Sequence, residues 1–266
     1  MSNSELDLAG RIAVITGAGG DLGAAAARLL AERGAAIVAV DRSAEALARL
    51  EQNFPPSARL LSVIADVTQE TQVADYVRAA IDAFGRIDIF FNNAGIEGSR
   101  TGAWRLIPDL SVEDFDEIIA VNAVGVFLGL KHVIPAMAEA GGGAIVNTAS
   151  INGLKGSRGQ VAYVASKHAV AAMTVSAARE WAGSGIRVNA IAPGAINGRM
   201  LRDYGEIILA NAPKAEPDAP PRWIPPPIAG WADPVQVAAM AVFLATDEAS
   251  YITGACYSVD GGLIAL

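Results

Sequence analysis

The sequence is poor in cysteine and in positive charge. Its single cysteine, Cys256, has no partner for a disulfide within the chain, which fits a reducing compartment. The 20 Lys and Arg residues are outnumbered by 28 Asp and Glu residues, so the formal net charge is −8. Nucleic acid and anionic membrane surfaces both require a basic face, and we therefore expect neither of them as a partner.

Long apolar runs and metal-ligand spacings are also missing. No uninterrupted apolar run approaches the ~20 residues that cross a bilayer, and the first residues show no basic stretch followed by an apolar one. We therefore expect a cytoplasmic protein. The two histidines, His132 and His168, have no partner at metal-ligand spacing, so we expect no metal site.

The 266 residues, 52% of them hydrophobic, are enough for one large α/β domain. Short apolar runs alternate with longer helical patterns almost to the end. Strands are expected at 11–16, 36–40, 60–65, 87–91, 144–148, 186–191 and 255–259, and helices at 22–33, 43–53, 69–84, 111–139, 160–182 and 234–245. This alternation predicts one domain over residues 1–266, a doubly wound parallel sheet of about seven strands with helices on both faces.

A proline-rich segment at about 197–231 interrupts the alternation. Seven of the 13 prolines lie between Pro213 and Pro227, which excludes a helix interior or a central strand. The segment is either a surface loop or a lid over a substrate site. Its flanks are apolar, and we take Met200, Tyr204 and Trp223 as candidate substrate contacts.

Tyr163 and Lys167 form a Tyr-x-x-x-Lys pair, and Ser150 lies thirteen residues before the tyrosine. Residues four apart share one face of a helix. A lysine ammonium beside a phenol favours the phenolate, so we expect Lys167 to lower the pKa of Tyr163. A nearby serine hydroxyl can hold a substrate oxygen. The three residues together predict a proton-transfer site.

A glycine-rich turn follows the first expected strand and precedes a helix. Its candidate cofactor-binding residues are Gly17, Gly19, Gly20, Asp21, Leu22 and Gly23. Such a turn lets backbone N–H groups approach a pyrophosphate at the N-terminus of a helix. Asp41, which closes the second strand, can accept both hydroxyls of an adenosine ribose and would repel a 2′-phosphate. Arg42 could counter that phosphate, but we expect Asp41 to dominate and predict NAD as the cofactor.

With these motifs, the chain resembles the short-chain dehydrogenase/reductase family over nearly its whole length. The remaining family motifs stand in the family's order as Asp66-Val67, Asn92-Asn93-Ala94-Gly95, Asn122, Val146–Ser150 and Pro193-Gly194. The resemblance implies a Rossmann fold and hydride transfer between a nicotinamide cofactor and a carbinol or carbonyl carbon. It also implies a homotetramer or homodimer that pairs the long helices around Asn122 and Tyr163.

The resemblance also implies the role of each site residue. Tyr163 would be the general acid and base, Lys167 would tune it and hold the nicotinamide ribose, and Ser150 would orient the substrate oxygen. Asn122 would hold a water that links Lys167 to solvent. Further cofactor contacts are implied for Asp66, Val67, Asn93, Ala94, Gly95, Pro193, Gly194 and Ile196.

The sequence departs from the family pattern at two positions. Asp21 replaces the middle glycine of the family's turn, where a carboxylate would repel the pyrophosphate unless it turns away or caps the helix. Gly19 and Gly20 are then expected to give the turn compensating flexibility. Gly198 stands where the family often has a threonine that contacts the nicotinamide amide, and the backbone of Ile196 can still bind that amide.

The substrate is predicted less directly. The candidate lid is apolar and has no cluster of Lys or Arg, which favours a hydrophobic, cyclic or aromatic secondary alcohol or ketone. Glu97 and Asn152 are further candidate contacts. The run from Asn92 to Gly98 resembles NAD-dependent dehydrogenases of cyclic alcohols and diols. Two alternatives remain: a 3-oxoacyl thioester reductase that uses NADPH, and a nicotinamide-binding sensor without catalysis.

Overall fold

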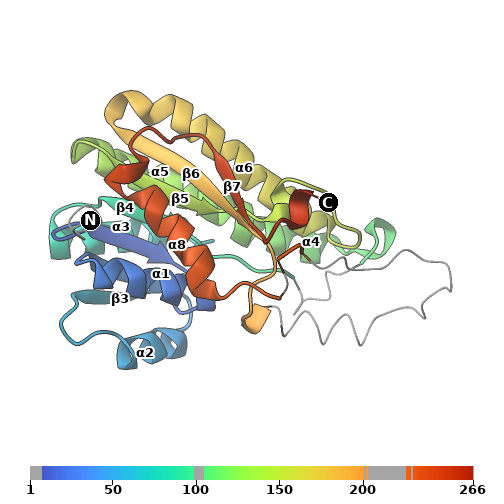
Figure 1. Cartoon of the computed structure of the whole chain (residues 1–266), viewed down its shortest axis with the longest axis horizontal. Helices are drawn as coiled ribbons and strands as arrows, with labels where there is room; N and C mark the ends of the chain where they lie inside the picture. The colour runs from blue at the N-terminus through green and yellow to red at the C-terminus, as the bar shows by residue number, and fades with distance from the viewer. Residues whose placement is uncertain (1–7, 99–104, 201, 203–225, 229, 266) are drawn as a thin grey trace.

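The computed structural model describes residues 8–98, 105–200, 202, 226–228 and 230–265. Its centre is one seven-stranded sheet in the order β3-β2-β1-β4-β5-β6-β7, with every pairing parallel. The strands are β1 (Ile12–Thr16), β2 (Ala36–Asp41), β3 (Leu60–Ile64), β4 (Ile89–Asn92), β5 (Gly143–Thr148), β6 (Ile186–Pro193) and β7 (Cys256–Val259). The predicted doubly wound sheet is confirmed (Figure 1).

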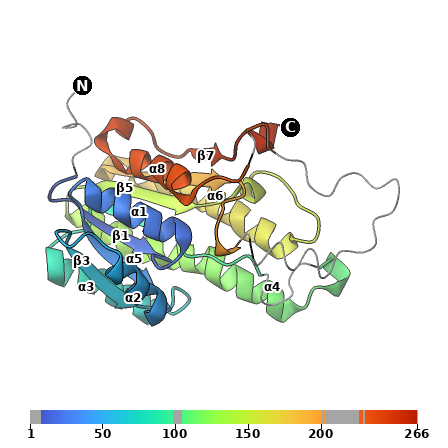
Figure 2. The same cartoon turned by 60° about the horizontal axis from the view of Figure 1, so that its bottom comes forward.

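Helices cover both faces of this sheet, as Figures 1 and 2 show. The helices are α1 (Asp21–Glu32), α2 (Ala44–Gln52), α3 (Glu70–Phe84), α4 (Val112–Ile119), α5 (Gly125–Glu139), α6 (Val161–Trp181) and α8 (Pro234–Ala245). One apolar cluster joins α1, α2 and α8 to the sheet, and a second joins α3, α5 and α6 to the opposite face. Strands buried on both faces explain the continuous apolar runs in the sequence.

Two helices, α2 and α8, begin directly after a residue whose side chain caps them. The Ser43 hydroxyl accepts the backbone N–H of Ala46 at 3.1 Å, so Ser43 caps α2 as expected. Asp233 caps α8 and forms a capping box with Gln236, and Pro234 takes the first helical position. A polar cap therefore defines where regular structure resumes after the proline-rich segment.

The long helix expected at 111–139 is divided by a short π-helix, Ala120–Val124, between α4 and α5. By length and composition alone, the stretch Val112–Glu139 could cross a membrane. Half of its most apolar window is buried inside the protein, and Val126, Leu130 and Val133 of α5 belong to the core. Packing against the sheet accounts for this composition.

The strand order reverses between β1 and β4, because β2 and β3 lie on one side of β1 and β4 to β7 on the other. The turns that leave β1 and β4 therefore diverge and open a crevice at the carboxyl ends of the strands. Parallel α/β sheets bind their ligands at such a switch point.

Candidate active site

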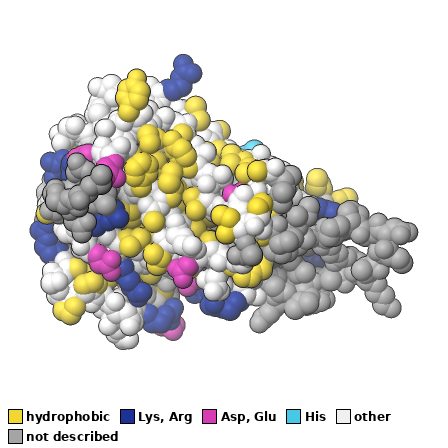
Figure 3. Space-filling view, viewed as in Figure 1, with side chains coloured by type: hydrophobic (Ala, Val, Ile, Leu, Met, Phe, Trp, Pro, Cys, Tyr) yellow, Lys and Arg dark blue, Asp and Glu magenta, His cyan; other side chains and the backbone are white. Residues whose placement is uncertain are grey.

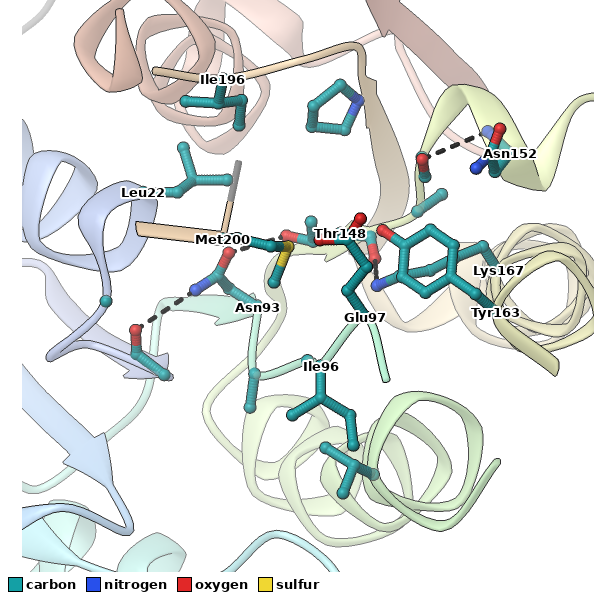
Figure 4. Close-up of a pocket in the computed structure, with 18 of the residues that line it drawn as sticks. Leu22, Asn93, Ile96, Glu97, Thr148, Asn152, Tyr163, Lys167, Ile196 and Met200 are labelled. Carbon is teal, nitrogen blue, oxygen red and sulfur yellow. Dashed lines mark hydrogen bonds between the residues drawn. The ribbon is translucent and has the colours of Figure 1, made fainter. Parts of the chain in front are cut away.

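A cavity of about 650 Å³ lies along the carboxyl ends of the strands. The turns that follow β1 to β6 all contribute to its wall, together with the first turns of α6. Figure 4 looks into this cavity and shows Leu22 and Asn93 on one side, with Tyr163 and Lys167 on the other. The cavity thus joins the glycine-rich turn to the Tyr-x-x-x-Lys pair.

Close packing requires glycine at three positions of the β1–α1 turn, Gly17, Gly19 and Gly23. Gly17 has a φ of +65°, and a Cβ there would lie 2.9 Å from Ala94 Cα. A Cβ on Gly23 would lie 2.2 Å from Gly17 O, and one on Gly19 would lie 2.4 Å from Ala46 Cβ. A Cβ on Gly20, which lines the cavity, would meet only Gly17 O at 3.3 Å. The compensating flexibility expected of Gly19 and Gly20 stays a prediction.

Asp41 stands at the end of β2 in the cavity wall. Its carboxylate accepts the backbone N–H of Gly19 at 3.0 Å and that of Ser43 at 2.9 Å. Arg42 lines the same part of the cavity. A carboxylate has about four acceptor sites, so these two bonds leave Asp41 able to accept further hydroxyl groups.

Asp21 is the first residue of α1, whose N-cap is Gly20, so it does not cap the helix, and it lines the cavity. Its carboxylate accepts the backbone N–H of Arg199 at 2.7 Å. A Cβ on Gly198 would lie 2.5 Å from the same carboxylate oxygen. The two departures from the family pattern are therefore in direct contact, and the absence of a side chain at 198 makes room for Asp21.

Asn93 holds the carboxyl ends of the central strands together. Its side-chain amide donates to Thr16 O at 3.0 Å, and its Oδ1 accepts the Thr148 hydroxyl at 3.1 Å. In the turn after the edge strand β3, Asp66 Oδ1 accepts both the N–H and the hydroxyl of Thr68. These bonds keep the turns around Asn93 and Val67 in the cavity wall.

Lys167 is 3% exposed and donates from Nζ to the Thr148 carbonyl at 2.9 Å. The same Nζ lies 5.7 Å from the centre of the Tyr163 ring. In Figure 4 both side chains reach the cavity from one helix, α6, as the four-residue spacing predicted. Tyr163 also shares a side-chain hydrogen bond with Ser150, so the serine, tyrosine and lysine form one cluster.

The pKa of Tyr163 moves in the direction opposite to the prediction. Burial, and secondly the charge of Glu97, raise the pKa of this phenol above its ordinary 10.0, while the hydrogen bond with Ser150 lowers it. Burial also lowers the pKa of Lys167 from 10.5 to about 8. The prediction considered only the neighbouring cation, whereas removal from water favours the neutral form of both groups.

Asn122 lies in the π-helical stretch and is fully buried. Its Oδ1 accepts the Ile96 N–H at 2.8 Å, and its Nδ2 donates to the Ile96 carbonyl at 2.8 Å and to the Ser166 hydroxyl at 3.1 Å. A Cβ on Gly95 would lie 3.2 Å from Asn122 Oδ1 and 3.3 Å from Lys167 Nζ. In this structure Asn122 holds the turn after β4 against α6, and π-helical turns often mark functional sites.

Glu97, Asn152 and Met200, which were predicted as substrate contacts, line the cavity. Tyr204 and Trp223, with most of the proposed lid, lie outside the described residues. Lys155 and Gln160, which were not among the predicted site residues, also line the cavity. Gln160 stands three residues before Tyr163 and seven before Lys167, a one-face helical spacing that could have identified it.

The cavity brings together nearly all the predicted site residues that the structure describes. The two outside its wall are Gly19, which packs between Ala46 and Asp41, and Asn122, which lies behind Ile96. His132 contacts Glu70 at 3.1 Å, and His168 contacts the Val164 carbonyl at 2.9 Å. Within the described part of the chain, no group of three or more His, Cys, Asp or Glu residues could hold a metal ion.

Comparison with known proteins agrees with this geometry. Residues 17–264 match the model of a family described as "Enoyl-(Acyl carrier protein) reductase". The chain belongs to the short-chain dehydrogenase/reductase family. It is an oxidoreductase that interconverts alcohols and ketones.

Similar proteins span nearly the whole length of the enzyme. Levodione reductase of Leifsonia aquatica is 40% identical over 256 residues, covering 95% of this chain and 93% of that protein. A crystal structure of levodione reductase is 38% identical and has a TM-score of 0.88, covering 97% of this chain and 98% of the other. Cyclohexanol dehydrogenase of Acinetobacter sp. (strain SE19) is 35% identical over 252 residues, 94% of each chain.

Two further similarities concern the cofactor and the acyl alternative. The crystal structure of NAD+-bound xylitol dehydrogenase has a TM-score of 0.88 at 34% identity, covering 96% of this chain and 99% of the other. The 3-oxoacyl-acyl-carrier-protein reductase of Thermotoga maritima is 37% identical over 260 residues, covering 97% of this chain and 99% of that protein.

Proposed function

We propose that this enzyme is an NAD-dependent dehydrogenase of hydrophobic cyclic secondary alcohols, acting also on the corresponding ketones. The observation that carries the proposal is a single cavity that holds Asp41 at one end and the Ser150, Tyr163 and Lys167 cluster at the other. The first end offers a carboxylate for ribose hydroxyls, and the second offers an acid–base pair for a carbinol.

The residues present fit a dinucleotide. The turn after β1 has no side chains at Gly17 and Gly20, so its backbone can approach a pyrophosphate at the N-terminus of α1. Asp41 favours an unphosphorylated ribose, and the backbone of Ile196 lies in the wall of the cavity beyond Gly194. The bound nicotinamide supplies hydride transfer, which protein side chains cannot perform.

The chain's own residues supply proton transfer and orientation. Ser150 holds the substrate oxygen, and Tyr163 gives a proton to it during ketone reduction or takes one during alcohol oxidation. Lys167, anchored on the Thr148 carbonyl, places a cation beside the phenol. Because burial raises the pKa of Tyr163, the phenol is the resting form; we expect oxidation to accelerate with rising pH and reduction to slow.

The cyclic alcohol class is supported by the wall of the cavity and by the relatives. Ile96, Val121 and Ile151 provide apolar surface on the substrate side. Cyclohexanol dehydrogenase and levodione reductase are relatives whose names indicate alcohols or ketones of this kind. An apolar wall with few polar groups is typical of a site for a small hydrophobic ligand.

The test measures initial rates with NAD and NADP across cyclohexanol, aryl secondary alcohols and 3-hydroxyacyl thioesters. We expect NAD and a cyclic or aryl alcohol to give the highest kcat/KM. Asp41→Ala should then shift the NAD to NADP ratio of kcat/KM toward NADP by at least about tenfold, because a like-charge contact is removed. A wild-type preference for NADP would overturn the role of Asp41.

A second candidate is a 3-oxoacyl thioester reductase, favoured by the 37% identity to the Thermotoga maritima enzyme. Activity confined to 3-hydroxyacyl thioesters with NADP would establish it instead. A non-catalytic sensor would bind NADH without turnover of any alcohol, which the same rate measurements distinguish.

We also propose a cytoplasmic homotetramer or homodimer. Val124, Phe127 and Val175 are large apolar residues that stay exposed around the π-helix, α5 and α6. Figure 3 shows apolar side chains gathered on the face that carries α8, and the stretch around this helix exposes Trp231, Val235 and Tyr251. Sedimentation velocity of the full chain tests the assembly, and a monomer at micromolar concentration would contradict it.

A further inference from the structure

A pair of side-chain amides lies beside the reacting groups. Asn152 Nδ2 donates to Gln160 Oε1 at 2.8 Å, and the backbone N–H of Asn152 donates to the Ser150 hydroxyl at 3.2 Å. Asn152 belongs to the turn after β5, and Gln160 precedes the first residue of α6. The amide pair therefore connects the segment carrying Ser150 to the helix carrying Tyr163.

Gln160 is only 6% exposed, and its side chain makes no capping bond to α6. Among the described residues, the enclosed side-chain atoms without a partner belong to Ser62, Tyr76 and Asn147. The free N–H group of Gln160 is thus not sealed inside the protein, and the open space that Gln160 borders is the cavity. A nearly buried amide that keeps an unused donor toward a cavity indicates a ligand group there.

The amide pair offers both a donor and an acceptor to a ligand, whichever way the two amides are oriented. As assigned, Gln160 keeps its N–H donors, and Asn152 keeps its carbonyl acceptor and one N–H. If both amides were turned over, Asn152 would keep the donor and Gln160 the acceptor. One donor and one acceptor match a neutral hydroxyl, which needs both, whereas a carboxylate offers only acceptors and an ammonium only donors.

We propose that Asn152 and Gln160 bind a second hydroxyl of the substrate, so that the preferred substrates are cyclic diols and hydroxyketones. This inference rests on the proposed function. Ser150 and Tyr163 hold the oxygen that reacts, and the amide pair holds the oxygen that does not. Binding the second hydroxyl there places the reacting carbon against the catalytic cluster. An alcohol without it gives no partner to the remaining donor of Gln160 and the remaining acceptor of Asn152.

The experiment compares kcat/KM for cyclohexanol with kcat/KM for the 1,2-, 1,3- and 1,4-cyclohexanediols, all with NAD. The wild-type enzyme is expected to favour at least one diol by about tenfold or more, because a site built for a hydroxyl rejects the analogue that lacks it. Gln160→Met, of similar length, should remove most of this preference. Gln160→Glu keeps an acceptor for Asn152 but loses the amide donor, so it should lower the ratio as well.

The control is Arg158→Gln, an exposed residue of the same loop that does not line the cavity, and it should keep the wild-type ratio. Equal kcat/KM for cyclohexanol and every diol in the wild type would overturn the inference while leaving the proposed function intact. So would a proportional fall for all alcohols in both Gln160 variants, which is the signature of a structural role. Failure to oxidise any alcohol with NAD would instead defeat the proposed function, and this inference with it.

Discussion

The β1 side and the α6 side of the cavity are built from different parts of the chain. On the β1 side, Gly17 and Gly23 allow backbone contacts that no Cβ would permit. On the α6 side, Tyr163 and Lys167 line the cavity from one face of α6, and Gln160 lines it from the position just before the helix. A site formed by backbone atoms tolerates few substitutions and suits a ligand group that is always the same. A site formed by side chains can be altered by substitution to suit a different substrate.

The two sides meet at the turn after β4, where Asn93 contacts β1 and β5 while Ile96 is held by Asn122. The proposed catalytic cluster and the turn proposed to hold the cofactor therefore depend on the same central strands. Substitutions on the α6 side should therefore change chemistry and selectivity, and those on the β1 side should change cofactor affinity.

The largest expected effect is on the α6 side. Tyr163→Phe should lower kcat by about 10²- to 10⁴-fold, because the proton donor and acceptor is removed. NADH binding, followed by its fluorescence, should remain close to that of the wild type. A residual rate within tenfold of the wild type would mean that another residue transfers the proton.

On the β1 side, Gly23→Ala should weaken NADH binding by about 10- to 100-fold, because the new Cβ collides with the backbone and overpacking costs about 1–3 kcal/mol. The matched control is Gly183→Ala, since a Cβ on Gly183 meets no atom within 4 Å. Circular dichroism separates a local change from a loss of fold. Unchanged NADH affinity in the Gly23 variant would contradict the expectation that substitutions on the β1 side change cofactor affinity.

Burial of the charged Lys167 side chain should lower the free energy of unfolding. Its pKa falls from 10.5 to about 8, and at about 1.36 kcal/mol for each pH unit this burial costs about 3 kcal/mol below pH 8. The cost disappears as pH rises from about 8 to 10.5, because the unfolded chain then loses the same proton. Lys167→Met should therefore be more stable than the wild type at pH 7.

The free energy of unfolding of Lys167→Met should exceed that of the wild type by about 2 kcal/mol at pH 7. Loss of the hydrogen bond to Thr148 offsets about 1 kcal/mol of the gain. Urea unfolding at pH 7 and at pH 10 measures it, and the difference between the two proteins should shrink at the higher pH. A variant less stable than the wild type at pH 7 would contradict the expected cost of burying this charge.

The smallest expected effect concerns the contact between the β1 turn and the start of the proline-rich segment. Gly198→Ala should disturb the bond from Arg199 N–H to Asp21 and raise the alcohol KM by about threefold, the loss of one modest hydrogen bond. In an Asp21→Gly background the same change should have little further effect. A double-mutant cycle measures this coupling, and additive effects would show that the contact is incidental.

The sequence alone was sufficient for the order of the elements and for most of their bounds. Apolar periodicity and capping residues such as Ser43 and Asp233 are local signals, and they predicted the seven strands to within a few residues. Motif spacing likewise predicted that Tyr163 and Lys167 lie together, because residues four apart on a helix share a face. The β1–α1 turn and Asp41 were expected at the cavity from their position after strands of a parallel sheet, and both line it.

Only the tertiary structure decided which distant residues touch and what they do to each other. The bond between Asp21 and Arg199 joins residues 178 positions apart, and the bond between Asn122 and Ile96 depends on a π-helical turn. The raised pKa of Tyr163 depends on how much water the fold removes, which no spacing in the sequence records. Local pattern determines the elements, whereas burial and contacts between loops arise only when the elements are packed together.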